Sequence, residues 1–218
     1  MDLSIAEILA VYVCLLFCLS VHEAAHAWTA DRAGDPTGRL LGRITLNPLA
    51  HMDPFGTVVF PLIMMVTGLP VFGWAKPVPF NPTNLKDDRW GPAFVALAGP
   101  LSHLAQLIVL IVGARLVFAV INPGIPAMIE SPWFFLLIML VNINLVLMLF
   151  NLIPVPPLDG HHVLYPFLSP SGQRMMEMIG PYGILIALLV ARYGLGVPLT
   201  FLRNVVFFLL FSGTDFSM

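Results

Sequence analysis

Long apolar stretches alternate with short polar connections along most of this 218-residue chain. Apolar runs occupy residues 4–29, 91–121 and 134–150, and weaker ones follow at 175–192 and 197–211. A run of about 17–25 apolar residues is long enough to cross a bilayer as a helix. The pattern therefore predicts an all-α polytopic membrane protein with about five to six transmembrane helices.

The apolar run at 55–72 differs from the others because two prolines and a glycine interrupt it. The proline-rich residues 73–82 that follow it are unsuited to a helix. Before it, apolar and polar residues alternate at 42–47, which predicts a short amphipathic strand. We therefore expect a short re-entrant or β-hairpin insertion after the first helix, with its irregular backbone covered by protein or water.

Composition supports a membrane protein, and the placement of the basic residues indicates its orientation. The chain is 58% hydrophobic and 10% charged, and its net charge of -2 argues against a nucleic-acid partner. Seven of the ten basic residues fall in the connection before residue 91 or after the run at 134–150: Arg32, Arg39, Arg43, Lys76, Lys86, Arg89 and Arg174. By the positive-inside rule, these connections are cytoplasmic and the N-terminus lies outside the inner (plasma) membrane.

This topology relates the depths of two distant segments. If residues 55–72 enter the membrane and return, the runs at 4–29 and 134–150 both point inward. Basic residues on both sides of 55–72 favour this return. The C-terminal ends of the two runs are then expected at similar depth.

Three ionisable residues lie near the inner end of the first run: His22, Glu23 and His26. Residues four apart on a helix differ by about 40° in azimuth, so the two imidazoles can bind one metal ion. Glu23 lies on the flank of that face, close enough to act as a general base on a metal-bound water. The alternative is a pair of intramembrane histidines in a proton relay or bonded to neighbouring helices.

A zinc site needs a third protein ligand. Asp159 directly follows the run at 134–150 at the matched depth, and the prolines before it break the helix and free its side chain. Asp53 is a second candidate, although an Asp before a proline is typical of a turn. We predict Asp159 as the third ligand.

The chain resembles the site-2 proteases, which are intramembrane zinc metalloproteases, in two motifs: His22-Glu23-x-x-His26 and Asn151-x-x-Pro154-x-x-x-Leu158-Asp159-Gly160. The stretches GDPTGRLLGRITLNPLAHMDPFGT, FGWAKPVPFNP and ALAGPLS are similar to segments of the compact bacterial branch that has no PDZ domain. The resemblance extends over nearly the whole chain.

The resemblance implies a single transmembrane metalloprotease domain over residues 1–218, with one Zn²⁺ held by His22, His26 and Asp159. Glu23 would be the general base and then the proton donor. The implied substrate is a single-pass transmembrane protein cut within or near the lipid bilayer. Regulation is then expected from a partner membrane protein, from earlier cleavage of the substrate, or from lipid.

Two further residues are candidates for contact with substrate. The resemblance implies that Asn151 holds the substrate backbone or the oxyanion, and a helix C-cap is the alternative. His103 stands where the family usually has asparagine. It either replaces that asparagine as a hydrogen-bonding side chain or makes activity pH-dependent near about pH 6–7. Asn142 and Asn144 are expected to form hydrogen bonds between helices.

The predicted strand at 42–47 offers an edge that would hold an unwound substrate by strand addition. Two other functions compete with a protease. One is a membrane transporter of metal or protons, which the absence of an internal repeat disfavours. The other is an inactive relative that only binds membrane proteins, which an intact Glu23 disfavours.

Overall fold

The computed structural model describes residues 4–67, 73–121, 128 and 130–212, and these residues form helices and irregular segments without a strand. The α-helices are α1 (Ile5–Ala33), α2 (Thr37–Leu40), α3 (Phe60–Thr67), α4 (Gly91–Ile121), α6 (Pro132–Asn151), α7 (Asp159–Leu164), α8 (Pro170–Ile179), α9 (Gly183–Gly194) and α10 (Gly196–Phe211). A π-helical turn, Pro54–Val59, leads directly into α3. The predicted all-α class is confirmed.

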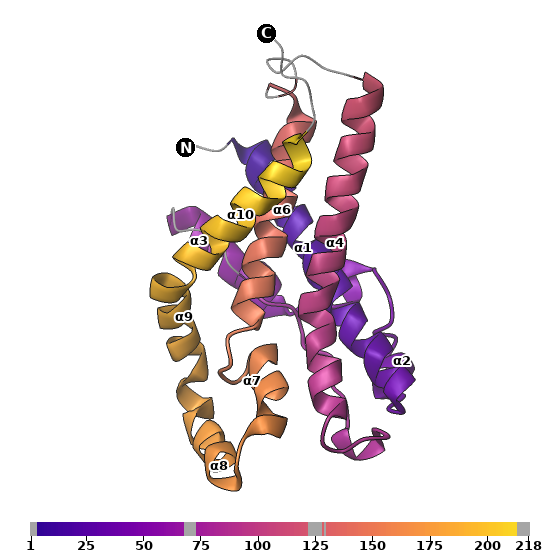
Figure 1. The fold of residues 1–218 in the computed structure, drawn as a ribbon, viewed down its shortest axis with the longest axis vertical. Helices are drawn as coiled ribbons and strands as arrows, with labels where there is room; N and C mark the ends of the chain where they lie inside the picture. Colours follow the sequence, from indigo (N-terminus) through magenta and orange to yellow (C-terminus); the bar gives the residue numbers. More distant parts are fainter. Residues whose placement is uncertain (1–3, 68–72, 122–127, 129, 213–218) are drawn as a thin grey trace.

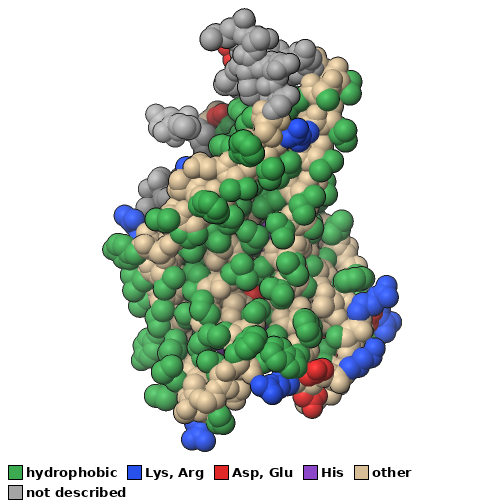
Figure 2. Space-filling view, in the orientation of Figure 1, with side chains coloured by type: hydrophobic (Ala, Val, Ile, Leu, Met, Phe, Trp, Pro, Cys, Tyr) green, Lys and Arg blue, Asp and Glu red, His purple; other side chains and the backbone are tan. Residues whose placement is uncertain are grey.

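Several of these helices suit a membrane. Among the described residues, four stretches are long and apolar enough to cross one: Ile5–Ala33, Gly91–Ile121, Pro132–Asn151 and Pro170–Gly194. Figure 2 shows apolar side chains over the middle of one face, with charged side chains at its margins and most of them near the lower edge. Such a surface is unfavourable in water and favourable in lipid. The chain is a multi-pass membrane protein.

Three helices form the centre of the molecule. α4 packs against both α1 and α6, and α1 also packs against α6. Figure 1 shows α1 and α6 running in the same direction, with α4 running the opposite way. The C-terminal ends of α1 and α6 therefore lie toward the same end of the bundle, which is the relation that the sequence predicted.

The two weak apolar runs near the C-terminus form α9 and α10, which follow one another along the bundle (Figure 1). α9 starts close to Pro156, which lies shortly after the end of α6. A Cβ on Gly183 would lie only 1.6 Å from the carbonyl oxygen of Pro156, so this approach requires glycine. α10 ends beside the far end of α4, where Arg115 Nη1 donates to the carbonyl of Leu209 at 2.6 Å. The two helices together extend once from one end of the bundle to the other.

The interrupted apolar segment returns to the end from which it leaves. The backbone N–H of Lys76 donates to the carbonyl of His51 at 2.8 Å, and that of Trp74 donates to Gly56 at 3.2 Å. The close approach requires glycine at position 73, since a Cβ there would lie 2.5 Å from the Gly56 oxygen. These contacts place residues 74–76 beside residues 51–56, which agrees with the predicted return; the predicted breaks at 68 and 70 lie outside the described residues.

The strand predicted at 42–47 is wrong. Gly42 has a φ of +67° and ends a turn in which Arg43 N–H donates to the carbonyl of Gly38 at 2.9 Å. The alternating apolar residues Ile44 and Leu46 are 37% and 58% exposed, so they do not pack together against the core. The alternation reflects outward-facing side chains of an irregular loop, and it offers no edge for strand addition.

A buried carboxylate fixes the corner that follows α1. The helix ends at Ala33 and is capped by Gly34, whose φ of +117° favours glycine. Asp35 is fully buried and accepts hydrogen bonds from Thr37 Oγ1 at 2.6 Å, Asn81 N at 2.7 Å and Asn84 Nδ2 at 2.8 Å. The side chain thereby joins the end of α1 to the chain that leads into α4.

We expect Asp35→Asn to lower the stability of the folded chain at neutral pH by about 1–3 kcal/mol. Burial raises the pKa of Asp35, but the hydrogen bonds from Thr37, Asn84 and Asn81 bring the pKa of that carboxyl below its ordinary value. Because the pKa of Asp35 is lower in the folded chain than in the unfolded one, ionised Asp35 stabilises the fold at pH values above its unfolded pKa of about 3.9. This stabilisation is lost as the pH falls through the folded pKa. Thermal unfolding in detergent should therefore separate variant from wild type at pH 7 and less so in acid. Asp88→Asn serves as the control, because Asp88 is exposed. Equal melting temperatures for Asp35→Asn and wild type at pH 7 would refute the stabilising role of Asp35.

Candidate metal centre

Three side chains converge where the C-terminal half of α1 meets the start of α7. The Nε2 atoms of His22 and His26 lie 2.9 Å apart, and each lies 3.3 Å from a carboxylate oxygen of Asp159. Zinc bonds of about 2.0–2.1 Å in a tetrahedral arrangement place ligand atoms about 3.3 Å apart. The structure therefore brings the three predicted ligands together at distances that suit Zn²⁺. We call these three residues the metal site.

The hydrogen bonds around the metal site leave the metal-binding atoms available. His26 Nδ1 lies 2.7 Å from the carbonyl oxygen of Val95, to which it donates, and His22 Nδ1 lies 3.1 Å from His103 Nε2. Each imidazole thus turns its Nε2 toward the site. Within the described part of the chain, the buried Asp159 Oδ2 accepts no hydrogen bond. A buried carboxylate oxygen without a donor is costly, and a cation would satisfy it.

The end of α6 determines the position of Asp159. α6 stops at Asn151, and residues 152–158, with their three prolines, turn the chain before α7 begins at Asp159 itself. A Cβ on Gly160 would lie 2.3 Å from the carbonyl oxygen of Leu152. Only glycine lets α7 return this closely against the end of α6, so Gly160 places its neighbour at the site.

A glycine on α4 lets that helix pack against the two imidazoles of the metal site. A Cβ on Gly99 would lie 2.4 Å from His22 Cε1 and 2.5 Å from His26 Nε2. α4 therefore approaches the two imidazoles with bare backbone at this turn. This role could not be predicted from the residue type, because a glycine in an apolar helix has many packing explanations.

Glu23 lies beside the metal site, 8% exposed, one position after His22. Its Oε2 accepts a hydrogen bond from the backbone N–H of Val78 at 2.9 Å. The extended residues that follow the re-entrant segment thus contact the predicted general base directly. Its catalytic role stays a prediction.

His103 supports His22 from behind. It is fully buried, and its Nδ1 lies 2.9 Å from Asn144 Oδ1. Asn144 uses its Nδ2 to donate to the carbonyl of Leu140 at 2.9 Å, so its Oδ1 is the acceptor. His103 must then carry its proton on Nδ1 and accept from His22 through Nε2. This chain of bonds leaves the His22 Nε2 lone pair for a metal.

This geometry bears on the other polar residues of the bundle. The contact from Asn144 to His103 links α6 with α4 and confirms the hydrogen bond predicted between helices. Asn142 instead donates to Ile138 within its own helix at 2.7 Å. Asn151, the last residue of α6, donates to the carbonyl of Leu147 at 3.0 Å. Substrate contact by Asn151 or His103 stays a prediction.

Asp53, the other carboxylate considered as a ligand, has a local role. Its Oδ1 accepts from the backbone N–H groups of Phe55 at 3.0 Å and Gly56 at 2.6 Å, at the start of the π-helical turn. The same oxygen cannot serve both these donors and a metal without breaking the turn. The structure therefore agrees with the interpretation of Asp53 as a turn residue.

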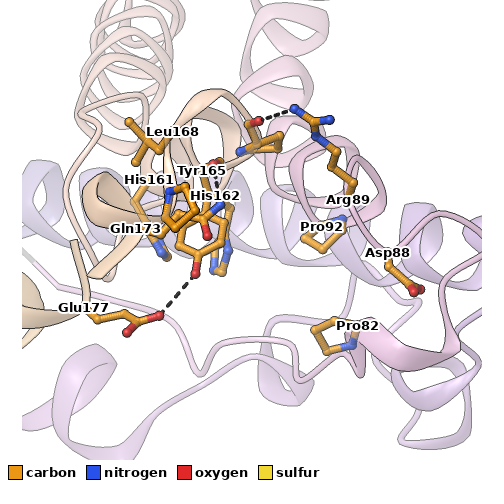
Figure 3. Close-up of a pocket in the computed structure, with 12 residues that line it drawn as sticks. Pro82, Asp88, Arg89, Pro92, His161, His162, Tyr165, Leu168, Gln173 and Glu177 are labelled. Carbon is orange, nitrogen blue, oxygen red and sulfur yellow. Dashed lines mark hydrogen bonds between the residues drawn. The ribbon is translucent and has the colours of Figure 1, made fainter. Parts of the chain in front are cut away.

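A cavity of about 620 Å³ opens beside α7 (Figure 3). His161 and His162 line it with their rings 4.1 Å apart, and Tyr165 Oη lies 3.1 Å from Glu177 Oε1 across it. Burial, with the neighbouring His161, lowers the pKa of His162 to about 4. This imidazole is therefore neutral at physiological pH.

Comparisons with known proteins add an independent finding. A model of one family, Peptidase family M50, matches residues 117–190, which include Asp159. The Bacillus subtilis (strain 168) protein named "Putative zinc metalloprotease YwhC" is 35% identical over 191 residues, which are 84% of this chain and 80% of that protein. Rip2 of Mycolicibacterium smegmatis, described in the same words, is 31% identical over 80% of this chain and 63% of its own length. Rip2 of Mycobacterium tuberculosis is 29% identical over the same shares. The chain thus spans less than two thirds of the Rip2 proteins, and no solved structure matches it.

Proposed function

Because the chain belongs to peptidase family M50, the site-2 protease family, we propose that this zinc metalloprotease cleaves transmembrane segments of other membrane proteins. One observation carries the proposal. His22 and His26 lie on α1, a helix long and apolar enough to cross a membrane, and they meet Asp159, which follows the end of α6, another such helix. A hydrolytic site in this position would act on peptide bonds within or near the bilayer.

The residues divide the chemistry between them. His22, His26 and Asp159 would hold the zinc ion, which when bound acts as a Lewis acid on the water and on the substrate carbonyl. Glu23 then takes a proton from the attacking water and delivers it to the leaving amine. His103 and the Val95 carbonyl hold the two imidazoles in the orientation that this requires.

The wider setting is also part of the proposal. We propose one metalloprotease domain over residues 1–218, with the N-terminus outside the inner membrane and the metal site toward the cytoplasm. The substrate would be a single-pass membrane protein. A further membrane protein, or earlier cleavage of the substrate, would control access.

Reconstitution with a single-pass substrate tests the proposal. The purified protein in vesicles should cut the substrate inside or at the edge of its apolar segment, and mass spectrometry of the products locates the cut. A zinc chelator should stop cleavage, and added Zn²⁺ should restore it. Zinc or proton flux across the vesicle without any cleavage would favour the transporter instead, and cleavage confined to soluble parts would refute the intramembrane site.

A further inference from the structure

Residues 76–81 contact α1 without forming a helix or a strand, and hydrogen bonds hold them on both sides of Val78. On one side, Lys76 N–H donates to the carbonyl of His51 at 2.8 Å. On the other, Asn81 N–H donates to the buried Asp35 carboxylate at 2.7 Å. Between these two anchors, Val78 N–H donates to Glu23 Oε2 at 2.9 Å. The position of Val78 over α1 is therefore set at both ends.

The sequence leaves a single backbone donor between two prolines in this stretch. Pro77 and Pro79 flank Val78, and proline has no backbone N–H. The N–H of Val78 is thus the sole backbone donor in the Pro77–Pro79 segment, and it is directed at Glu23. The two prolines also restrict the backbone to extended conformations, which limits how far the N–H can swing away.

Small residues let this stretch lie close to the helix. A Cβ on Gly38 would lie 3.1 Å from Ala27 Cβ and 3.3 Å from Val78 Cγ1, so the three residues meet with little space between them. Ala27 is fully buried one helical turn beyond Glu23. The contact between Val78 and Glu23 is thus part of a packed interface, where a hydrogen bond to a carboxylate is strong.

We propose that the Pro77–Val78–Pro79 segment is the positioning element of Glu23, with the Val78 N–H fixing Oε2 so that Oε1 performs the proton transfer. The inference rests on the proposed function, in which Glu23 is the general base. A carboxylate held at one oxygen has a defined second oxygen, whereas a free one rotates about χ3. Holding the carboxylate in one orientation removes the entropy that would otherwise be lost when it is oriented in each catalytic cycle.

The test compares Val78→Pro, which deletes the N–H, with Val78→Ala, which keeps it. We expect the kcat of Val78→Pro to lie about 10- to 100-fold below that of Val78→Ala, the loss that a charge-assisted hydrogen bond predicts. KM for a transmembrane substrate and the zinc content should be equal in the two variants, since neither depends on the N–H. A purely structural effect would instead raise KM or reduce zinc.

If Val78→Pro does not fold, replacement of Val78 by its α-hydroxy acid deletes the same N–H by changing one amide to an ester, and the same ratio is expected. Equal kcat in the two Val78 variants, with Glu23→Gln inactive, would overturn this inference and leave the proposed function standing. Full cleavage by Glu23→Gln would overturn the role of Glu23 as general base, and failure of the wild type to cleave any transmembrane substrate would overturn the proposed function itself.

Discussion

Replacing Glu23 by glutamine should leave a chain that holds zinc and no longer cleaves its substrate. Glutamine keeps the size of the side chain, and its amide oxygen can still accept the N–H of Val78. It cannot take a proton from water. A general base contributes about 10²–10⁴-fold to the rate, so cleavage should fall by at least this factor while zinc remains at the wild-type level.

The measurement pairs zinc stoichiometry with cleavage of one transmembrane substrate under identical conditions. Glu130→Gln is the matched control, because Glu130 is exposed and precedes the start of α6, whereas Asp159 of the metal site follows the end of that 20-residue helix. That control should cleave normally. Normal cleavage by Glu23→Gln would mean that another group moves the proton, and loss of zinc would mean that Glu23 supports the metal instead.

The metal site was accessible to prediction because its signals are local. Spacing on one helix placed His22 and His26 on one face, and a break after a second apolar run exposed Asp159. The link between these two segments came from charge, since the basic residues on both sides of 55–72 favoured a return. Contacts from Lys76 to His51 and from Trp74 to Gly56 agree with that argument.

The supporting residues were not accessible in this way. Gly99, Val95 and Val78 contribute bare or backbone atoms to the site, and such contacts leave no residue-type signature. They depend on which turn of α4 meets α1 and on where the re-entrant chain crosses it. The wrong strand at 42–47 has a related cause, because an alternating pattern does not reveal whether its apolar residues face a core.

His103 lies between these two cases. Its departure from the expected asparagine was visible in the sequence, but its partners were not. The contacts to His22 and Asn144 explain how an imidazole can fill the position: it accepts at Nε2 and donates at Nδ1, as a carboxamide accepts and donates with its two ends. The residue type therefore follows from the pair of bonds it must make.

Replacing Asp159 by asparagine should remove zinc and cleavage together. The substitution keeps the shape of the side chain but exchanges an anionic oxygen for a neutral amide oxygen, a much poorer zinc ligand. It also leaves two imidazoles without the negative charge that a divalent ion needs nearby. Zinc per chain should fall well below one, and cleavage should fall to background. Wild type should gain thermal stability on addition of Zn²⁺, because binding to the folded state alone is stabilising, and the variant should not.

Asp53→Asn is the control that makes this result specific. Asp53 caps a helical turn and Asp159 is the first residue of one, but Asp53 accepts from Phe55 and Gly56 N–H, whereas Asp159 Oδ2 accepts no hydrogen bond from the residues that the structure describes. An asparagine at position 53 can keep those bonds through its own oxygen, so zinc content should stay at one per chain. If Asp53→Asn lost the metal and Asp159→Asn kept it, the third ligand would have been assigned to the wrong carboxylate. Asp159 Oδ2 lies 3.3 Å from His22 Nε2 and has no hydrogen-bond donor among the described residues, which argues for the opposite result.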